Sequence, residues 1–120
     1  MSCIINPKIS IITVVYNDVD LIENTIRSVV LQKYTNIEYI IIDGGSNDGT
    51  IDIINKYADK ISILVSEPDK GIYDAMNKGI ILATGNWINF INSGDTLINK
   101  DTVENIFSDS FPFSHPNGLL

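Results

Sequence analysis

The stretch that decides the fold is residues 9–16, Ile-Ser-Ile-Ile-Thr-Val-Val-Tyr, an almost unbroken run of β-branched and aromatic side chains. Such a run is typical of a strand that is covered on both faces, as in a parallel sheet. Strand-length apolar runs follow at residues 37–43, 61–65 and 87–91, and we expect the last of these to be an interior strand. Helical patterns separate the runs. This alternation predicts an α/β fold, a Rossmann-like, mostly parallel sheet with helices on both faces.

The apolar spacing between the strands predicts the helices. Their inner faces would be formed by Ile22, Ile26, Val29 and Val30 in the first; Ile51, Ile54 and Ala58 in the second; Ile72, Ala75, Met76, Gly79, Ile80 and Ala83 in the third; and Val103, Ile106 and Phe107 in a short closing helix. Gly85 stands where the third helix would have its C-terminal cap. We expect a single domain over residues 1–107 and a C-terminal tail over residues 108–120, which have no periodic apolar face.

The charge balance narrows the classes of partner. The 120 residues include 8 Lys and Arg against 15 Asp and Glu, which gives a formal net charge of −7. We therefore expect no nucleic-acid partner. Cys3 is the only cysteine, so an intrachain disulfide and a thiolate metal cluster are excluded. The sequence lacks the pattern of a signal peptide, and its apolar runs are of strand length, which favours a cytoplasmic location.

Ligands of open parallel sheets bind at the carboxyl ends of the strands, so the residues there are the candidates for a site. After the first strand come Tyr16, Asn17 and Asp18, where a dinucleotide fold would need Gly-x-Gly-x-x-Gly. The missing glycines disfavour a nicotinamide or flavin enzyme. An aromatic ring followed by a carboxamide could instead stack on a flat base and bond its edge. Alternatively, Tyr16 ends the strand, and Asn17 or Asp18 caps the next helix.

The second strand ends at Asp43, and the glycine-rich residues 44–50 follow it. This stretch lacks the lysine of a phosphate loop and the glutamate of a calcium-binding loop. A turn capped by Asn47 or Asp48 is a sufficient account of it. Asp43 itself must find hydrogen-bond donors at the end of a buried strand. It is either a turn residue or a ligand contact, and the sequence leaves both open.

The other two strand ends are polar as well. Residues 66–71, Ser-Glu-Pro-Asp-Lys-Gly, are kept out of a helix by proline and glycine. The turn Asn92-Ser-Gly-Asp95 offers oxygen ligands, which suit a hard cation such as Mg²⁺ or Mn²⁺. Each motif is also what an ordinary turn would use. Asp43, Asp69 and Asp95 are nevertheless expected together at one edge of the sheet, which indicates a ligand site there.

Four segments in this order resemble the N-terminal half of the family 2 nucleotide-sugar glycosyltransferases, which have the glycosyltransferase A fold. The segments are Ile9–Asn17, Tyr39–Thr50, Ser66–Gly79 and Ala83–Asp95. The similarity runs from about Lys8 to about Phe107, nearly the whole chain. The Ser-Glu-Pro-Asp-Lys-Gly stretch looks like members that build bacterial surface polysaccharides.

The resemblance implies roles for individual residues. Tyr16 would lie against the nucleobase, Val14 would offer backbone contacts, and Asp43 would bond the base edge. Asp95 would hold Mn²⁺ or Mg²⁺ across the diphosphate. The complete set of nucleotide-binding residues implied in this way is Val14, Tyr16, Asn17, Asp43, Asp69, Lys70, Gly94 and Asp95. Gly94 is a departure, because many relatives carry an acid there, and this leaves one carboxylate for the metal.

The implied reaction is metal-dependent, inverting transfer of a sugar from a nucleoside-diphosphate sugar to a saccharide or lipid-linked acceptor in surface polysaccharide synthesis. Uridine is the expected base, with guanosine and thymidine left open. The enzyme would work in the cytoplasm or peripherally at the inner face of the membrane. We assign no catalytic base, since the family pattern places it beyond residue 120 and His115 stands alone in the tail.

Two further hypotheses stay open. The chain is a non-catalytic nucleotide-sugar-binding or interaction module, or it is an unrelated nucleotide-binding α/β protein of the receiver or phosphatase type. We also expect self-association, because a sheet that is truncated relative to the family leaves an edge strand and an apolar face uncovered.

Overall fold

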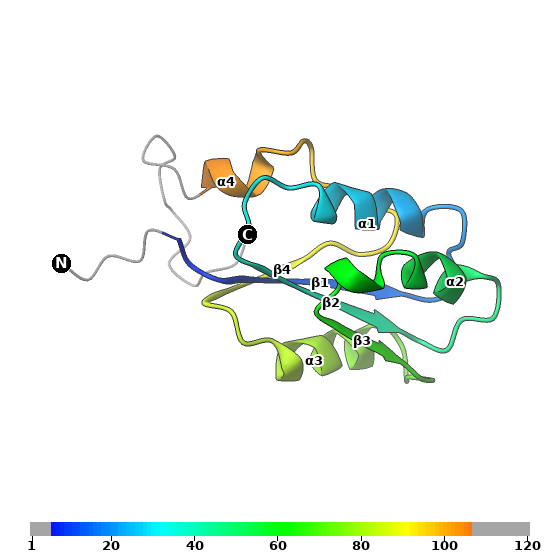
Figure 1. Cartoon of the computed structure of the whole chain (residues 1–120). Helices are drawn as coiled ribbons and strands as arrows, with labels where there is room; N and C mark the ends of the chain where they lie inside the picture. Colours follow the sequence, from blue (N-terminus) through cyan, green and yellow to red (C-terminus); the bar gives the residue numbers. More distant parts are fainter. Residues whose placement is uncertain (1–5, 107–120) are drawn as a thin grey trace.

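The computed structural model describes residues 6–106 as a four-stranded parallel sheet with helices on both faces (Figure 1). The strands are β1 (Ile9–Val15), β2 (Ile37–Asp43), β3 (Ile63–Ser66) and β4 (Trp87–Phe90), and the helices are α1 (Ile22–Val30), α2 (Thr50–Asn55), α3 (Ile72–Leu82) and α4 (Thr102–Ile106), with a 3₁₀ turn at Ala58–Lys60. The strand order is β3-β2-β1-β4. The predicted α/β class and parallel sheet are confirmed.

Strand β1 lies inside the sheet, and all seven of its residues are buried. Its register aligns Ile9 with Ile37 of β2 and with Trp87 of β4. Successive side chains point to opposite faces. Ile11 belongs to the core cluster with α1, α2 and α4, whereas Ile12 packs in the cluster that α3 covers (Figure 1). Burial on both faces explains why the strand reads as an unbroken apolar run.

The C-terminal ends of α2 and α3 differ from the predicted ones. Helix α2 ends at Asn55, and Ala58 falls in the following 3₁₀ turn, exposed instead of buried. Gly85 does not cap α3, because α3 ends at Leu82 and the backbone is already extended at Ala83. A Cβ on Gly85 would lie 2.7 Å from the main-chain nitrogen of Ser10. This glycine is therefore explained by its close approach to β1.

Two other expectations change. Strand β4 is not interior, because within residues 6–106 it forms one edge of the sheet. The inner face of α3 is narrower than its pattern suggests: Ala75 and Gly79 are buried, while Ile72 and Ile80 are about half exposed, at 52% and 45%. The predicted contribution of Phe107 to the closing helix, the tail over 108–120, Cys3 and His115 lie outside the described residues.

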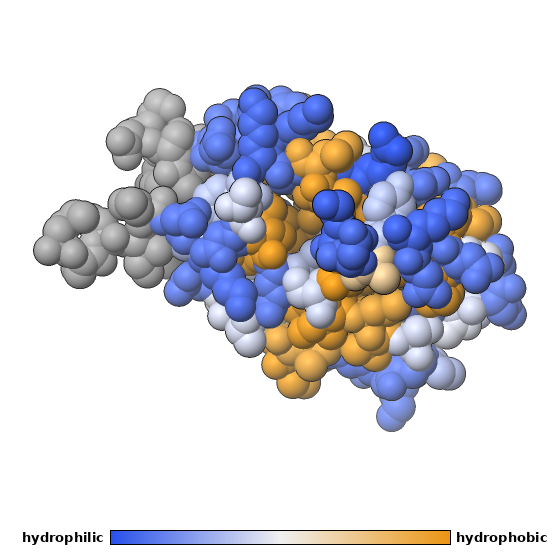
Figure 2. Space-filling model, in the orientation of Figure 1, coloured by the Kyte–Doolittle hydropathy of each residue, from blue (hydrophilic) through white to orange (hydrophobic). Residues whose placement is uncertain are grey.

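An apolar surface remains over α3. Ile72 and Ile80 are joined there by Tyr73 and Ile81, which are the most exposed apolar side chains of this helix. Figure 2 shows apolar residues gathered on this side of the molecule. The predicted self-association stays a prediction, and this surface and the edge of β4 are where it can be tested.

At the amino end of the sheet, a buried carboxylate ties three segments together. Glu38 accepts hydrogen bonds from Ser10 Oγ (2.7 Å), the Thr84 main-chain N–H (2.9 Å) and Thr84 Oγ1 (2.9 Å), and Lys8 Nζ lies 3.6 Å away. Burial acts to raise the pKa of Glu38, but these donors and the Lys8 charge outweigh it and lower the pKa below its usual value. The connection from α3 to β4 is thereby fixed beside β1.

Candidate functional site

The loops that follow the four strands meet at the carboxyl edge of the sheet. Main-chain hydrogen bonds link them: Gly44 N–H donates to Val15 O (2.9 Å), Glu67 N–H to Asp43 O (3.0 Å), and Ser93 N–H to Val14 O (3.1 Å). Main-chain pairing thus continues for one residue beyond β2 and β3 and for three residues beyond β4. Residues far apart in the sequence are held at this edge as one surface.

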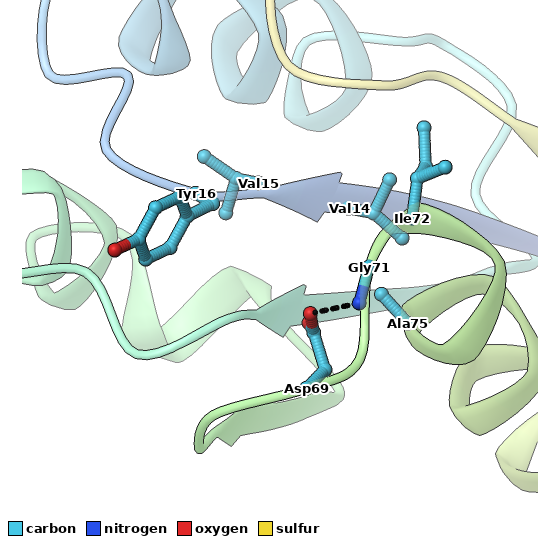
Figure 3. Close-up of a pocket in the computed structure, with 7 residues that line it drawn as sticks. All are labelled: Val14, Val15, Tyr16, Asp69, Gly71, Ile72 and Ala75. Atoms are coloured by element: carbon cyan, nitrogen blue, oxygen red, sulfur yellow. Dashed lines mark hydrogen bonds between the residues drawn. The ribbon is translucent and has the colours of Figure 1, made fainter.

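A pocket of about 280 Å³ opens at this edge (Figure 3). It is lined by Val14, Val15, Tyr16, Asp69, Gly71, Ile72 and Ala75. Most of this lining is apolar. The Tyr16 ring is 62% exposed, and Asp69 provides the one carboxylate of the lining. The arrangement suits a flat ring that lies against Tyr16 and presents a polar edge to Asp69. Of the predicted residues, Val14, Tyr16 and Asp69 are brought together here.

The loop that carries Asp69 is anchored at several points. The Asp69 carboxylate accepts a hydrogen bond from Gly71 N–H through Oδ1 (3.1 Å), as Figure 3 shows, and Asp74 of α3 accepts one from Lys70 N–H (2.9 Å). Lys78 Nζ forms an ion pair with Glu67 Oε2 at 3.0 Å. The hydrogen bond and the charge of Glu67 raise the pKa of Lys78. Residues 67–71 are therefore fixed to the first turns of α3. The predicted site residue Lys70 is exposed in this loop, outside the pocket lining.

Asp43 is the most enclosed of the predicted residues. It is fully buried, and its Oδ2 accepts hydrogen bonds from Gly45 N–H (3.0 Å), Ser46 N–H (2.9 Å) and Ser66 Oγ (2.9 Å), while Oδ1 accepts one from Ser46 Oγ (2.5 Å). Of the two alternatives left by the sequence, the geometry supports the turn residue. A contact between Asp43 and a nucleobase stays a prediction.

Asn17 and Asp18 connect loops and do not cap a helix. Asn17 is in the left-handed conformation (φ 47°), and its Oδ1 accepts a hydrogen bond from Asn47 N–H (2.8 Å). Asp18 Oδ2 accepts one from Ser93 Oγ (2.6 Å), which joins the end of β1 to the turn after β4. Helix α1 begins later, at Ile22, without a side-chain cap. The role of Asp18 was missed because its partner lies 75 residues away in the sequence.

Asp48 fulfils the predicted capping role in the glycine-rich stretch. Its Oδ1 accepts hydrogen bonds from the hydroxyl (2.5 Å) and the main-chain N–H (3.0 Å) of Thr50, the first residue of α2. The Thr50 hydroxyl is the main cause of a lowered pKa for Asp48. Asp48 is thus a structural residue of the turn.

The turn after β4 carries the predicted metal ligand. Gly94 has a φ of 97° and donates its N–H to Thr25 Oγ1 (2.9 Å), and the Asp95 side chain is exposed. In the same turn, Asn92 Oδ1 is a buried acceptor that receives no hydrogen bond from residues 6–106. No three His, Cys, Asp or Glu residues between positions 6 and 106 are grouped so that they could hold a metal. The oxygen donors fit a hard cation that takes its other ligands from substrate phosphates and water.

Residues 10–108 match the family model described as glycosyl transferase family 2. The chain belongs to this family. It is 41% identical over 98 residues to an uncharacterized glycosyltransferase of Mycobacterium tuberculosis, covering 81% of this chain and 37% of that protein. It is 38% identical over 101 residues to the putative teichuronic acid biosynthesis glycosyltransferase TuaG of Bacillus subtilis, covering 82% and 40%. This chain therefore spans well under half the length of these relatives.

Solved structures of glycosyltransferases show the same fold. TarS of S. aureus (residues 1–349), in complex with UDP-GlcNAc, superposes with a TM-score of 0.74 at 29% identity, over 81% of this chain and 29% of that one. The mannosyltransferase PcManGT of Pyrobaculum calidifontis, in complex with GDP-Man and Mn²⁺, gives 0.77 at 25% identity, over 89% and 33%. The predicted family 2 membership and glycosyltransferase A fold are confirmed. None of the helices within residues 6–106 is long and apolar enough to cross a membrane.

Proposed function

We propose that this chain is the donor-binding part of a family 2 glycosyltransferase that takes its sugar from a nucleoside-diphosphate sugar, with uridine as the base. The observation that carries the proposal is the pocket between Tyr16 and Asp69 at the carboxyl edge of the sheet. Its position is where ligands of open α/β sheets bind. Support comes from TarS, which was solved with UDP-GlcNAc, and from the mannosyltransferase, which was solved with GDP-Man.

In the proposed complex, the base lies against the exposed ring of Tyr16, with Asp69 at its edge. The diphosphate extends toward the turn that carries Gly94 and Asp95, and the exposed Lys70 flanks it. The Asp95 carboxylate would hold Mn²⁺ or Mg²⁺ there, in line with the Mn²⁺ of the mannosyltransferase complex. A bound cation of this kind supplies Lewis-acid stabilisation of the charge on the leaving nucleoside diphosphate.

The remaining steps of the proposal concern the acceptor. Transfer would proceed with inversion, by direct displacement at the anomeric carbon, and needs a base to deprotonate the acceptor hydroxyl. We assign no such base among the described residues. A saccharide or lipid-linked acceptor of surface polysaccharide synthesis agrees with the teichuronic acid relative. We place the transfer in the cytoplasm or at the inner face of the membrane as part of the proposal.

Calorimetric titration with UDP, with and without Mn²⁺, tests this proposal. We expect binding that is strengthened by Mn²⁺ in the wild type and that loses its dependence on Mn²⁺ in Asp95→Ala. Asp59→Ala is the matched control, because Asp59 is an exposed carboxylate in the 3₁₀ turn before β3, at the opposite end of the sheet. If UDP, GDP and dTDP all fail to bind with Mn²⁺ present, the nucleotide site is refuted. Unchanged Mn²⁺ dependence in Asp95→Ala would refute the metal assignment alone.

The second candidate is a non-catalytic nucleotide-sugar-binding module. It would use the same pocket between Tyr16 and Asp69 and would differ from the first candidate only in having no transfer activity. Hydrolysis of UDP-GlcNAc, or transfer of its sugar, by the 120-residue chain would exclude this candidate. Nucleotide binding without either activity, at any acceptor tested, would favour it.

A further inference from the structure

Gly44 leaves a space that the Asp69 carboxylate occupies. A Cβ placed on Gly44 would lie 2.9 Å from Asp69 Oδ2 and 3.3 Å from Cδ1 of Tyr16. The first distance is too short for any real side chain, so even alanine at position 44 would displace the Asp69 carboxylate. The Asp69 carboxylate and the Tyr16 ring therefore both approach Gly44. The two side chains line the same pocket (Figure 3).

The two oxygens of Asp69 are not equivalent. Oδ1 accepts the hydrogen bond from Gly71 N–H, whereas Oδ2 accepts none from residues 6–106. Gly71 has a φ of 115°, and the backbone on both sides of it is held by α3 and by the Lys70–Asp74 hydrogen bond. The carboxylate is thus held in place with one oxygen left for a ligand. Asp43, in contrast, is fully buried and has both oxygens engaged.

We propose that Asp69, and not Asp43, selects the nucleobase: its Oδ2 accepts the imino N–H of a uracil-type base that lies against Tyr16. An ionised carboxylate accepts hydrogen bonds and cannot donate them. Uracil and thymine present a single N–H between two carbonyl groups. Cytosine presents an unprotonated nitrogen at that position, which Oδ2 would repel. Guanine presents two adjacent N–H groups, which call for both carboxylate oxygens, and Oδ1 already serves Gly71. This inference rests on the proposed nucleotide site.

Variation of the ligand tests the inference without altering the fold. At saturating Mn²⁺, we expect the wild type to bind UDP about 10- to 100-fold more tightly than CDP or N3-methyl-UDP, the range expected for one hydrogen bond to a charged group. In Asp69→Ala the difference between UDP and N3-methyl-UDP should disappear, which separates the lost hydrogen bond from the size of the methyl group. Equal binding of UDP and N3-methyl-UDP to the wild type would overturn the inference.

Asp69→Asn gives the sharper test. The amide keeps an oxygen for Gly71 N–H and turns an NH₂ group toward the base, where it opposes the N–H of uracil and matches the bare nitrogen of cytosine. We expect the preference for UDP over CDP to be lost or reversed. Gly44→Ala should weaken the same preference by moving the unaltered Asp69, and Asp59→Asn serves as the charge-matched control. Circular dichroism verifies that each variant is folded.

The possible outcomes separate this inference from the proposed function. If Asp69→Asn keeps the wild-type preference for UDP over CDP, Asp69 does not select the base, although the nucleotide site stands. A wild type that prefers GDP to UDP also overturns the inference while leaving the site intact. If none of these nucleotides binds to the wild type, the proposed function fails, and the base-selecting role of Asp69 fails with it.

Discussion

Replacing Asp43 separates the two roles that a carboxylate at the end of β2 can have. Its four hydrogen bonds come from two main-chain amides, Gly45 and Ser46, and from two serine hydroxyls, those of Ser46 and Ser66. The hydroxyls can rotate toward other acceptors, but the amides are fixed by the turn. In Asp43→Ala both amides lose their acceptor.

The expected cost follows from these contacts. A buried donor left without an acceptor costs about 1–3 kcal/mol. Gly45 and Ser46 are half-buried, so we expect the lower part of that range for each, or about 2–4 kcal/mol in total for Asp43→Ala. In Asp43→Asn an oxygen remains for both amides and the NH₂ group can donate to Ser46 Oγ, so the loss should be about 1 kcal/mol. The predicted order of stability is wild type, then asparagine, then alanine.

Urea unfolding followed by far-UV circular dichroism measures the free energy of unfolding, provided that the m-values agree among the variants. Asp59→Ala is the control and should lie within about 0.5 kcal/mol of the wild type, as expected for a surface substitution. Folded Asp43→Asn should retain the preference for UDP over CDP, in contrast to Asp69→Asn. The reasoning is refuted if Asp43→Ala is as stable as the wild type, and most directly if it is stable but no longer binds UDP.

Three more predictions concern packing, pH and association. Gly79→Ala should lower the free energy of unfolding by about 1–2 kcal/mol, because its Cβ would lie 2.5 Å from Ile12 Cγ2 and this overpacking outweighs the gain of about 1 kcal/mol in helix propensity. In an Ile12→Ala background the same substitution should leave the free energy of unfolding unchanged or raise it. A decrease in that background would contradict the contact with Ile12. The pKa of Glu38 is lowered in the folded chain, so its carboxylate stabilises the fold only while it is ionised. The stability difference between wild type and Glu38→Gln should therefore be constant from neutral pH to about pH 5 and shrink as the pH falls below about 4. A difference that grew on acidification would contradict this prediction. Light scattering at rising concentration should show self-association that an Ile81→Lys substitution on α3 weakens, and a monomer at all concentrations would dispose of that expectation.

The sheet could be predicted from sequence because burial on both faces of a parallel strand leaves a local mark. The sequences of β1 and β2 are nearly continuous runs of apolar, mostly β-branched residues. The start of α3 at Ile72 could also be predicted, because Gly71 stands directly before it. The meeting of the loops after the strands could be predicted as well, since parallel strands place all their carboxyl ends on one edge of the sheet. The local sequence could not show which distant residue each side chain or glycine contacts. Gly85 looks like a helix cap until Ser10, 75 residues earlier, is seen against it.

The same limit explains why the sequence leaves the role of Asp43 open. Asp43 is the last residue of β2 and Asp69 follows β3 by three residues, and their local sequences give no reason why Asp43 is fully buried while Asp69 is half-buried. The distinction depends on Ser66, which closes over Asp43 from β3, and on Gly44, whose missing side chain leaves room for Asp69 Oδ2. Each of these residues lies more than twenty positions from the carboxylate whose role it decides. Only the paired strands bring them together.

The electrostatics of the edge connect these carboxylates to the proposed ligand. A chain with a net charge of −7 repels a diphosphate, and at the strand ends this repulsion is partly offset where N–H and O–H donors surround a carboxylate. Asp43 and Asp48 are of that kind, because the amides and hydroxyls of their own turns surround them. Asp95 is exposed, and no such donor from residues 6–106 bonds its carboxylate, so in the proposed complex the diphosphate approaches it together with a cation. In the proposed complex the base, which is uncharged, lies in an apolar pocket with a single carboxylate. Hydrogen bonds within the turns engage Asp43 and Asp48, and our proposal assigns two other carboxylates, Asp69 to the base and Asp95 to the cation.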